Sequence, residues 1–263
     1  MARSVVALLS DFGTRDHYAG AMKGVVLGIC PDANLVDISH DVPTHDVLTA
    51  GLELAAVYKC FPSGSIFLVV VDPGVGSARR GLAADIGDYR LVAPDNGVLT
   101  AVFKEMPPKR VVELTERRYA RPTVSRTFEG RDRFAPAAAW LAKGIQLTAL
   151  GRPVSDYQRL DIPSPIIVDG RIVGEVLLVD RFGNLVTNIN RKDFERLSGA
   201  GTIQIVVGTE SIGRLVETYA DIRTDEVCAL FGSTDHLEFA ANSASAVVRL
   251  GLERGALVTV SLD

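Results

Sequence analysis

Apolar and polar residues follow two patterns in the first 160 residues of the chain. Short apolar runs that end at polar or turn-forming residues predict strands, and between them apolar residues recur at helical spacing. The predicted strands are Val5–Leu9, Leu35–Ile38, Ile66–Val71, Leu82–Ile86 and Leu91–Ala93, and the predicted helices are Tyr18–Ile29, Asp46–Cys60, Asp95–Phe103 and Arg131–Lys143. This order predicts an α/β domain over residues 1–160 with a largely parallel sheet and helices on its faces.

The pattern changes near Asp161, where two prolines flank Ser164 and predict a linker over residues 161–166. Short apolar runs follow without long helical patterns between most of them. They are Ile172–Val179, Leu185–Ile189, Thr202–Val207, Val227–Phe231, Ala246–Leu250 and Leu257–Leu262. Such runs predict a small antiparallel β-barrel or sandwich over residues 167–263.

Charge and cysteine content narrow the class of protein. The chain has 263 residues and a formal net charge of −4, which argues against a nucleic-acid partner because phosphate binding needs clustered Lys and Arg. No apolar run reaches the roughly 18 residues of a membrane span. Cys30, Cys60 and Cys228 are far apart among apolar neighbours, which predicts buried free thiols in a reducing compartment and therefore a cytoplasmic protein.

Polar residues follow several of the predicted strands. Asp11 follows the first strand, Asp72 follows Ile66–Val71, and Asp95 and Asn96 follow the strand that ends at Ala93. Turn formation alone accounts for each of them. As a group they favour a binding crevice, because ligands of open α/β sheets bind beyond the carboxyl ends of the strands.

Two other motifs are better explained by turns than by ligand binding. Gly74–Gly76 lacks the further residues of a dinucleotide or P-loop motif, so it predicts a tight turn with a positive φ. His40, Asp41, His45 and Asp46 have the composition of a metal site but not the spacing of one, and Pro43 breaks any helix that could align them. We therefore expect a loop with a helix N-cap and no metal.

Charged and polar residues also gather later in the chain. In TFEGRDRF, Glu129 and its neighbours are either a helix start or a charged wall beside a helix N-terminus. After residue 166, such residues stand in two stretches, DRFGNLVTN and FGSTDHLEFAANSAS. They are Asp180, Asn184, Ser233, Asn242 and Ser243. These side chains belong either to hairpin turns or to a pocket suited to an amino acid or a nucleobase.

Six blocks together resemble the S-adenosylmethionine hydroxide adenosyltransferase family, which is related to the fluorinating and chlorinating enzymes that use the same substrate. They are LLSDFGTRDHYAGAMKGV, VVDPGVGSARR, APDNGVLT, TFEGRDRFAPAAAWLA, DRFGNLVTNI and FGSTDHLEFAANSAS, in the family's order over nearly the whole chain. The resemblance implies an α/β domain followed by a β-barrel domain, and a homotrimer with active sites between neighbouring subunits. It implies that water or hydroxide displaces methionine from the ribose 5′-carbon, with S-adenosylmethionine as substrate and no cofactor.

The resemblance also implies roles for individual residues. The family has an Asp-Arg-His triad, whose Asp and Arg match Asp72 and Arg79, while its His position holds Glu129. By the same match, Asp11 holds the ribose hydroxyls, Asp180 and Ser233 bind the methionine portion, and Asn184 binds the adenine. Asp95, Asn96, Asn242 and Ser243 are expected in or near the same site.

The leaving group is a neutral thioether, so the chemical difficulty is the weak nucleophile. We expect Asp72 and Arg79 to orient a water molecule and share the developing charge, with Glu129 accepting the proton or supporting the pair. Three alternatives remain from the sequence: a halogenase on the same scaffold, a binding protein without catalysis, and a generic α/β hydrolase. The last lacks the Gly-x-Ser-x-Gly elbow, and in the halogenating relatives a tyrosine replaces the Asp72 carboxylate.

Overall fold

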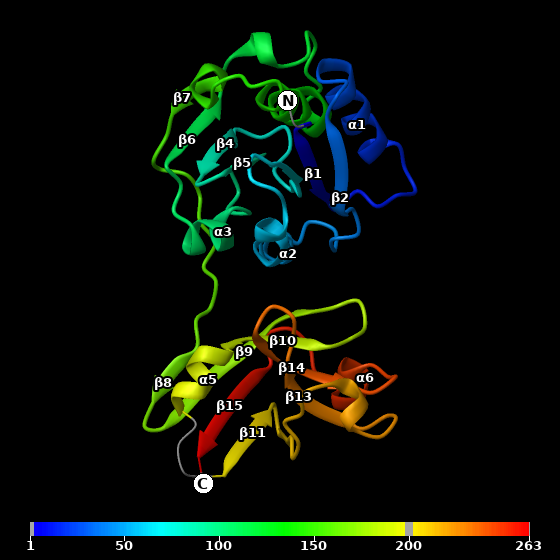
Figure 1. The fold of residues 1–263 in the computed structure, drawn as a ribbon, viewed down its shortest axis with the longest axis vertical. Helices are drawn as coiled ribbons and strands as arrows, with labels where there is room; N and C mark the ends of the chain where they lie inside the picture. The colour runs from blue at the N-terminus through cyan, green and yellow to red at the C-terminus, as the bar shows by residue number, and fades with distance from the viewer. Residues whose placement is uncertain (1–2, 198–201, 263) are drawn as a thin grey trace. The chain divides into compact units, whose positions relative to one another are not determined.

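The computed structural model describes residues 3–197 and 202–262. The chain divides between Asp161 and Ile162 into two compact units, each of which is described by itself (Figure 1). The division falls at the first residue of the predicted linker.

The first unit contains a seven-stranded sheet in the order β2-β1-β3-β5-β4-β6-β7. Its strands are β1 (Val5–Ser10), β2 (Asn34–Ser39), β3 (Ile66–Val70), β4 (Gly81–Ile86), β5 (Tyr89–Pro94), β6 (Arg110–Leu114) and β7 (Gly151–Pro153). Strands β2, β1, β3 and β5 are parallel, whereas β4, β6 and β7 pair antiparallel.

The prediction of a largely parallel sheet therefore holds only in part, because the sheet is mixed. The cause is the link between β4 and β5, which consists of Gly87 and Asp88. A two-residue link can only form a hairpin, because a parallel connection needs a crossover of a dozen residues or more. Gly87 has a φ of +56°, the left-handed conformation that such hairpin turns require.

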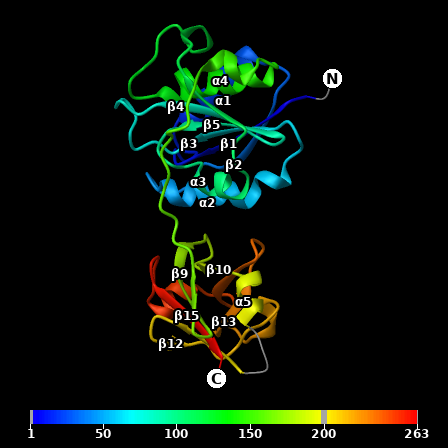
Figure 2. The same cartoon turned by 90° about the vertical axis from the view of Figure 1, so that its left-hand side faces the viewer.

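Four α-helices cover the two faces of this sheet: α1 (Tyr18–Ile29), α2 (Val47–Val57), α3 (Thr100–Glu105) and α4 (Ala135–Ala142). Figure 2 shows α1 and α4 on one face and α2 and α3 on the other. A π-helical turn, η3 (Gly130–Phe134), precedes α4, and short 3-10 turns lie at η1 (Tyr58–Cys60), η2 (Arg117–Tyr119) and η4 (Leu147–Leu150).

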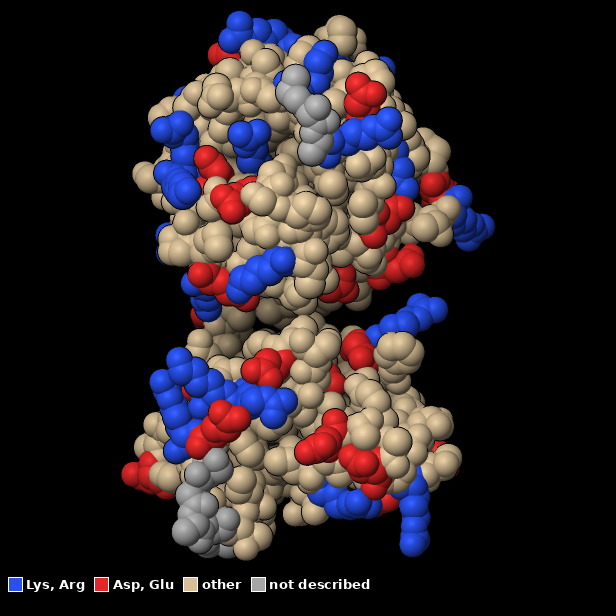
Figure 3. All heavy atoms as spheres, in the orientation of Figure 1, with Lys and Arg blue, Asp and Glu red and all other residues tan. Residues whose placement is uncertain are grey.

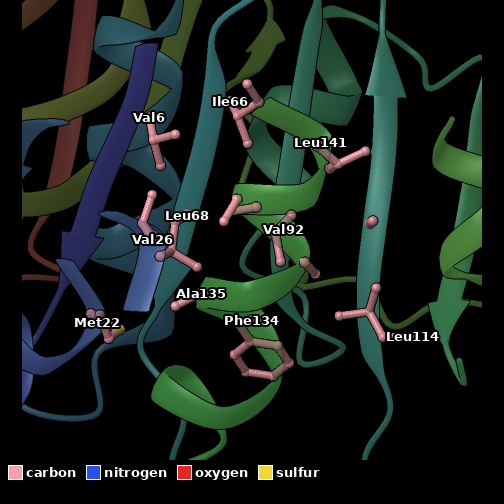
Figure 4. Close-up of a cluster of buried hydrophobic side chains, with 14 of the residues drawn as sticks. Val6, Met22, Val26, Ile66, Leu68, Val92, Leu114, Phe134, Ala135 and Leu141 are labelled. Carbon is pink, nitrogen blue, oxygen red and sulfur yellow. The ribbon is translucent and has the colours of Figure 1, made fainter. Parts of the chain in front are cut away.

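The apolar core of the first unit has two layers, one on each face of the sheet. In β1, Val6 and Leu8 belong to one layer while Ala7 and Leu9 belong to the other, as the period of a strand requires. Figure 4 shows part of the layer between the sheet and helices α1 and α4. Burial on both faces explains why these strands read as continuous apolar runs.

The helix predicted from Asp95 begins later, at Thr100. Asp95 does not cap it, because its two carboxylate oxygens accept hydrogen bonds from Arg80 and from the backbone of Gln158. In contrast, Asp46 caps α2 as expected and accepts from the Thr49 amide. A carboxylate before an apolar run is thus a helix signal only when no distant donor competes for it.

The second unit contains one antiparallel sheet of eight strands, in the order β12-β11-β15-β9-β10-β14-β13 with β8 beside β9. The strands are β8 (Ile166–Val168), β9 (Arg171–Val179), β10 (Leu185–Asn190), β11 (Ile203–Val207), β12 (Glu210–Ser211), β13 (Val227–Phe231), β14 (His236–Ala241) and β15 (Leu257–Leu262). Among the described residues β12 and β13 do not pair with each other. The sheet is a curled half-barrel that does not close, whereas we predicted a small antiparallel β-barrel or sandwich.

The unit also contains the helices α5 (Arg191–Leu197) and α6 (Ala246–Leu250) and the 3-10 turn η5 (Tyr219–Asp221). The prediction of a strand at Ala246–Leu250 is wrong, since this segment is α6. Ser245 caps the helix through the Val248 amide, and Gly251 ends it with a φ of +64°. A serine N-cap and a glycine after the last turn are helix signals that outweigh the β-branched residues between them.

The cysteines only partly match the prediction of buried thiols: Cys228 is buried, Cys30 is half-buried and Cys60 is exposed. Burial raises the pKa of the Cys228 thiol. Within the described ranges, no helix has the length and apolar character needed to cross a bilayer. In the same residues, no group of three or more His, Cys, Asp or Glu side chains is arranged to hold a metal ion. On the face in Figure 3, basic and acidic side chains are interspersed on each unit.

Candidate functional site

Asp72 and Arg79 form a buried ion pair at the end of β3. Arg79 Nε donates to Asp72 Oδ1 at 2.8 Å, and Nη2 donates to Oδ2 at 2.5 Å. The two side chains are only 9% and 6% exposed for Arg79 and Asp72 respectively. A planar guanidinium that binds both carboxylate oxygens fixes the orientation of the pair.

The glycine-rich loop brings Arg79 back to Asp72. Gly76 has a φ of +77°, and a Cβ there would lie 2.6 Å from the carbonyl oxygen of Arg126. A Cβ on Gly74 would approach Arg79 Cγ to 3.3 Å. The positive φ predicted for this turn is thus present at Gly76, and the loop needs its glycines to pack this closely.

Glu129 reaches the same cluster from the turn before α4. Its Oε2 lies 2.6 Å from Arg79 Nη2, and its Oε1 accepts from Arg133 Nη1 at 3.1 Å. Oε2 is buried and forms an ion pair with Arg79. The three residues of the predicted triad therefore lie together.

The cluster is electrostatically balanced, because the carboxylates of Asp72 and Glu129 face the guanidiniums of Arg79 and Arg133. Burial alone would lower the pKa of Arg79, but hydrogen bonds and charge from Asp72, together with Glu129, raise it above its usual value. The guanidinium also lies 5.1 Å from the ring of Phe134. Arg79 is therefore a permanent cation at this position.

A cavity of about 360 Å³ lies beside Glu129 and Arg133. Its other walls come from β6, η2, α4 and the segments next to them, and neither Asp72 nor Arg79 lines it. Glu129 thus lies between the buried ion pair and a cavity that could not be predicted from the sequence.

Asp11 and Asp72 follow neighbouring parallel strands at the same edge of the sheet. Ser10, the last residue of β1, pairs in register with Val70 at the end of β3. Asp11 Oδ2 accepts from the backbone amide of His45 at 2.9 Å. This placement agrees with a crevice beyond the carboxyl ends of the strands.

Asp95 and Asn96 have structural contacts at the same edge. Asn96 Nδ2 donates to the carbonyl of Val71 at 2.8 Å, directly before Asp72. Asp95 is buried and accepts from Arg80 Nε at 2.7 Å. Both residues therefore support the backbone on either side of the Asp72–Arg79 loop.

The histidine-rich segment is a loop in the structure. His40 is buried, and its Nδ1 lies 2.7 Å from Ser10 Oγ, while its Nε2 lies 3.1 Å from Asp37 Oδ1. Sequence reasoning considered His40 as a metal ligand and passed over Ser10 and Asp37. The one available signal was a serine at the end of an otherwise apolar strand.

In the second unit, Asp180 and Asn184 lie in the hairpin between β9 and β10. Asp180 Oδ1 accepts from the amides of Phe182 and Asn184, and Oδ2 accepts from Asn184 Nδ2 at 2.8 Å. Ser233 is exposed in the hairpin between β13 and β14. These predicted binding residues are therefore in hairpin turns, which was one of the two interpretations of their sequence.

Asn242 and Ser243 form a turn after β14. Asn242 Nδ2 donates to the carbonyl of Ile222 at 2.8 Å, and Ser243 Oγ donates to Asn242 Oδ1 at 3.0 Å. Ser243 has a φ of +57°. The pair thus holds the segment before β13 against the end of β14.

Sequence reasoning missed a buried carboxylate in this unit. Glu238 on β14 is 7% exposed and accepts from the hydroxyl of Tyr219 at 3.1 Å. Burial and the charge of Asp180 raise the pKa of Glu238, and burial with the charge of Glu238 raises the pKa of Tyr219 to about 12. Glu238 lies in β14, a strand that was not predicted from the sequence, so its burial was not anticipated.

Comparison with known proteins gives one consistent family. Residues 6–151 match the family model for the SAM hydroxide adenosyltransferase N-terminal domain, and residues 174–259 match that for the C-terminal domain. An (R)-S-adenosyl-L-methionine hydrolase from Thermus thermophilus is 36% identical over 95% of this chain and 96% of its own length. A fluorinase from Actinoplanes sp. is 29% identical over 98% of this chain and 97% of its own length.

A solved structure has the same fold. The crystal structure of an uncharacterized conserved protein from Thermotoga maritima matches with a TM-score of 0.92 and 34% sequence identity, over 97% of this chain and 99% of that one.

Proposed function

The chain belongs to the SAM hydroxide adenosyltransferase family, and from this we propose that it hydrolyses S-adenosyl-L-methionine to adenosine and L-methionine. The hydrolases among its relatives support the activity. The observation that carries the chemistry is the buried Asp72–Arg79 pair with Glu129 beside it.

The reaction is a displacement at the ribose 5′-carbon. The oxygen of water forms a bond to this carbon while the carbon–sulfur bond breaks, and the electron pair of that bond goes to sulfur. The sulfonium becomes the neutral thioether of methionine, so no general acid is needed. The attacking water loses one proton, which the protein must accept or pass to solvent.

We assign the orientation of this water to Asp72 and Arg79. A carboxylate oxygen can accept a hydrogen bond from the water, and the guanidinium stabilises the negative charge that grows on the water oxygen. Both side chains are nearly buried, where such interactions are stronger than in bulk water. We assign the role of proton acceptor to Glu129, whose carboxylate lies beside this pair.

Balanced charge in the cluster suits this chemistry. The two carboxylates are offset by Arg79 and Arg133, so the cluster presents no excess negative charge to the sulfonium. An excess would stabilise the cationic substrate more than the transition state, in which that charge is disappearing, and would slow the reaction.

The other predicted residues are assigned to substrate binding. Asp11 takes the ribose hydroxyls, Asp180 and Ser233 take the methionine portion, and Asn184 takes the adenine. Asp95, Asn96, Asn242 and Ser243 support the loops around them through the hydrogen bonds described above. We propose no cofactor, because the sulfonium supplies its own leaving group.

We further propose a homotrimer with active sites between neighbouring subunits. The residues assigned to the reaction lie in the first unit and several of those assigned to the substrate lie in the second. This assembly is implied by the family resemblance, and the cytoplasmic location stays a prediction from the sequence.

Incubation of the purified protein with S-adenosyl-L-methionine tests the function directly. We expect adenosine and methionine in equal amounts by chromatography, with no 5′-halo nucleoside when chloride or fluoride is added. A 5′-halo nucleoside as the main product would assign the chain to the halogenases. Binding of adenosine without any methionine release would make it a binding protein.

A further inference from the structure

A chain of hydrogen-bonded side chains runs from the surface to the end of β1. Lys23 Nζ on α1 donates to Asp37 Oδ2 at 2.6 Å, and Asp37 Oδ1 lies 3.1 Å from His40 Nε2. His40 Nδ1 in turn lies 2.7 Å from Ser10 Oγ. Ser10 is fully buried and His40 is 4% exposed, so the inner half of the chain is shielded from water.

When His40 is neutral, its partners fix the direction of each hydrogen bond in this network. Asp37 can only accept, so the proton of a neutral His40 must sit on Nε2 and Nδ1 is left as an acceptor. Ser10 Oγ therefore donates to Nδ1, and it accepts the amide of Phe12 at 3.4 Å. The neutral imidazole satisfies each of these contacts at once.

Ser10, His40 and Asp37 are the residue types of a nucleophilic triad, but the burial excludes that role. A nucleophilic serine must reach substrate, whereas Ser10 has no exposed surface. The hydrogen-bonded network must therefore act by holding neighbouring segments in place.

Its surroundings are the loop that carries Asp11. The amide of Gly13 donates to the carbonyl oxygen of His40 at 2.6 Å. Asp11 lies between Ser10 and Phe12, both of which are tied to this network. On the other side, the His45 amide donates to the Asp11 carboxylate at 2.9 Å. The backbone on both sides of Asp11 is therefore fixed by contacts that meet at His40.

We propose that His40 is a positioning residue for ribose recognition, because through Ser10 and its own carbonyl it holds the loop that presents Asp11. The inference rests on the proposed function, in which Asp11 binds the ribose hydroxyls. No direct contact between His40 and substrate is required.

Two amide substitutions separate positioning from packing. In His40→Asn the amide lies near the position of Nδ1 and can keep the contact with Ser10. In His40→Gln it lies near the position of Nε2, so it can keep the contact with Asp37 and loses Ser10. If His40 only filled space, the two variants would have similar effects on nucleoside binding.

The measurement is the dissociation constant for adenosine and for 2′,3′-dideoxyadenosine, determined by calorimetry. We expect His40→Gln to weaken adenosine binding roughly tenfold, the size of one lost hydrogen bond to a charged group, and to leave dideoxyadenosine unchanged. His40→Asn is expected to retain most of the preference for adenosine. Ser10→Ala, which removes only a hydroxyl, should likewise weaken the binding of adenosine and leave that of dideoxyadenosine unchanged.

Ser65→Ala is the matched control, since Ser65 is also buried and its hydroxyl donates to Pro62, at the opposite end of the parallel strands. It should not alter the preference for adenosine. Equal loss of both nucleosides in His40→Gln and Ser10→Ala, or no change in preference in either, would overturn the inference. Hydrolysis of S-adenosyl-L-methionine by the unsubstituted protein, measured in parallel, tests the proposed function separately.

Discussion

The guanidinium of Arg79 contacts two carboxylates from segments that are 57 positions apart, since Asp72 follows β3 and Glu129 precedes α4. The contact between Asp72 and Arg79, which are only seven positions apart, follows from local sequence, because a strand end and a glycine-rich loop bring them together. The contact between Arg79 and Glu129 depends on how α4 packs against the sheet, which no local sequence pattern encodes.

The first prediction concerns this ion pair. Asp72→Ala and Arg79→Ala should each lower turnover at saturating substrate by tens-fold or more, as typical losses of general-base and charge-stabilising groups do. Steady-state assays of methionine release measure the effect. Lys59→Ala, which removes an exposed ion pair with Glu105, is the control and should retain turnover. Near-normal turnover in both test variants would remove the pair from the mechanism.

Glu129 differs from the family's histidine, and its role is tested by Glu129→Gln. Glutamine keeps the size of the side chain and can still accept from Arg133, but it cannot take a proton. We expect the pH dependence of turnover to change, measured as a pH–rate profile with substrate in excess. A profile that keeps its shape would limit Glu129 to a structural role.

At the scale of elements, the π-helical turn η3 is held by Asp132. The Asp132 side chain is fully buried and accepts from Arg131 at 2.7 Å, from Arg121 at 3.1 Å and from the Ser125 amide at 2.8 Å. Burial alone would raise its pKa, but these donors and charges lower it below its usual value. The turn positions Glu129, so Asp132 supports the site through backbone geometry.

Asp132→Asn should reduce the free energy of unfolding by roughly 2 kcal/mol at neutral pH, because the buried side chain loses charge-assisted hydrogen bonds to two partly exposed arginines. A carboxyl with a lowered pKa in the folded state stabilises above its unfolded pKa of about 4 and loses this contribution as the pH falls. The difference between the two proteins should therefore shrink in acid. Denaturant unfolding at several pH values measures it.

Asp235→Asn provides the control, since its ion pair with Arg191 is largely exposed and such pairs contribute little. If Asp132→Asn lowered the free energy of unfolding as little as Asp235→Asn does, the role of Asp132 in holding the turn would be contradicted.

Most elements of the first unit could be predicted because their apolar runs are long, and α2 also carries Asp46 as an N-cap. One error occurred where a residue typical of a helix start forms hydrogen bonds with residues distant in the sequence. Asp95 was expected to begin a helix but binds Arg80 and Gln158 instead. In the second unit, α6 is short, and its valines made the segment resemble a strand although its serine cap and terminal glycine signal a helix.

At the scale of the whole molecule, the residues that we assign to substrate binding are divided between two compact units, each with its own apolar core. The division could be anticipated from the change in pattern near residue 161. The mixed direction of the first sheet was signalled locally, by the short link between β4 and β5, whereas the open edge of the second depends on pairing between distant strands.

The proposed trimer can be tested by complementation. Asp72→Ala and Asn184→Ala subunits should each be inactive alone. A co-expressed mixture should recover activity, because some active sites then contain an intact Asp72 from one subunit and an intact Asn184 from its neighbour. Light scattering should give three times the chain mass of 28.2 kDa. A fully active monomer, or a mixture without recovered activity, would contradict sites shared between subunits.

The central claim is that water attacks the 5′-carbon of the ribose. Turnover of S-adenosyl-L-methionine in water labelled with heavy oxygen, followed by mass spectrometry of the nucleoside, tests it most directly. The account predicts one labelled oxygen in the 5′-hydroxyl of adenosine and none in methionine. Adenosine without the label, or a nucleoside other than adenosine as the product, would contradict it.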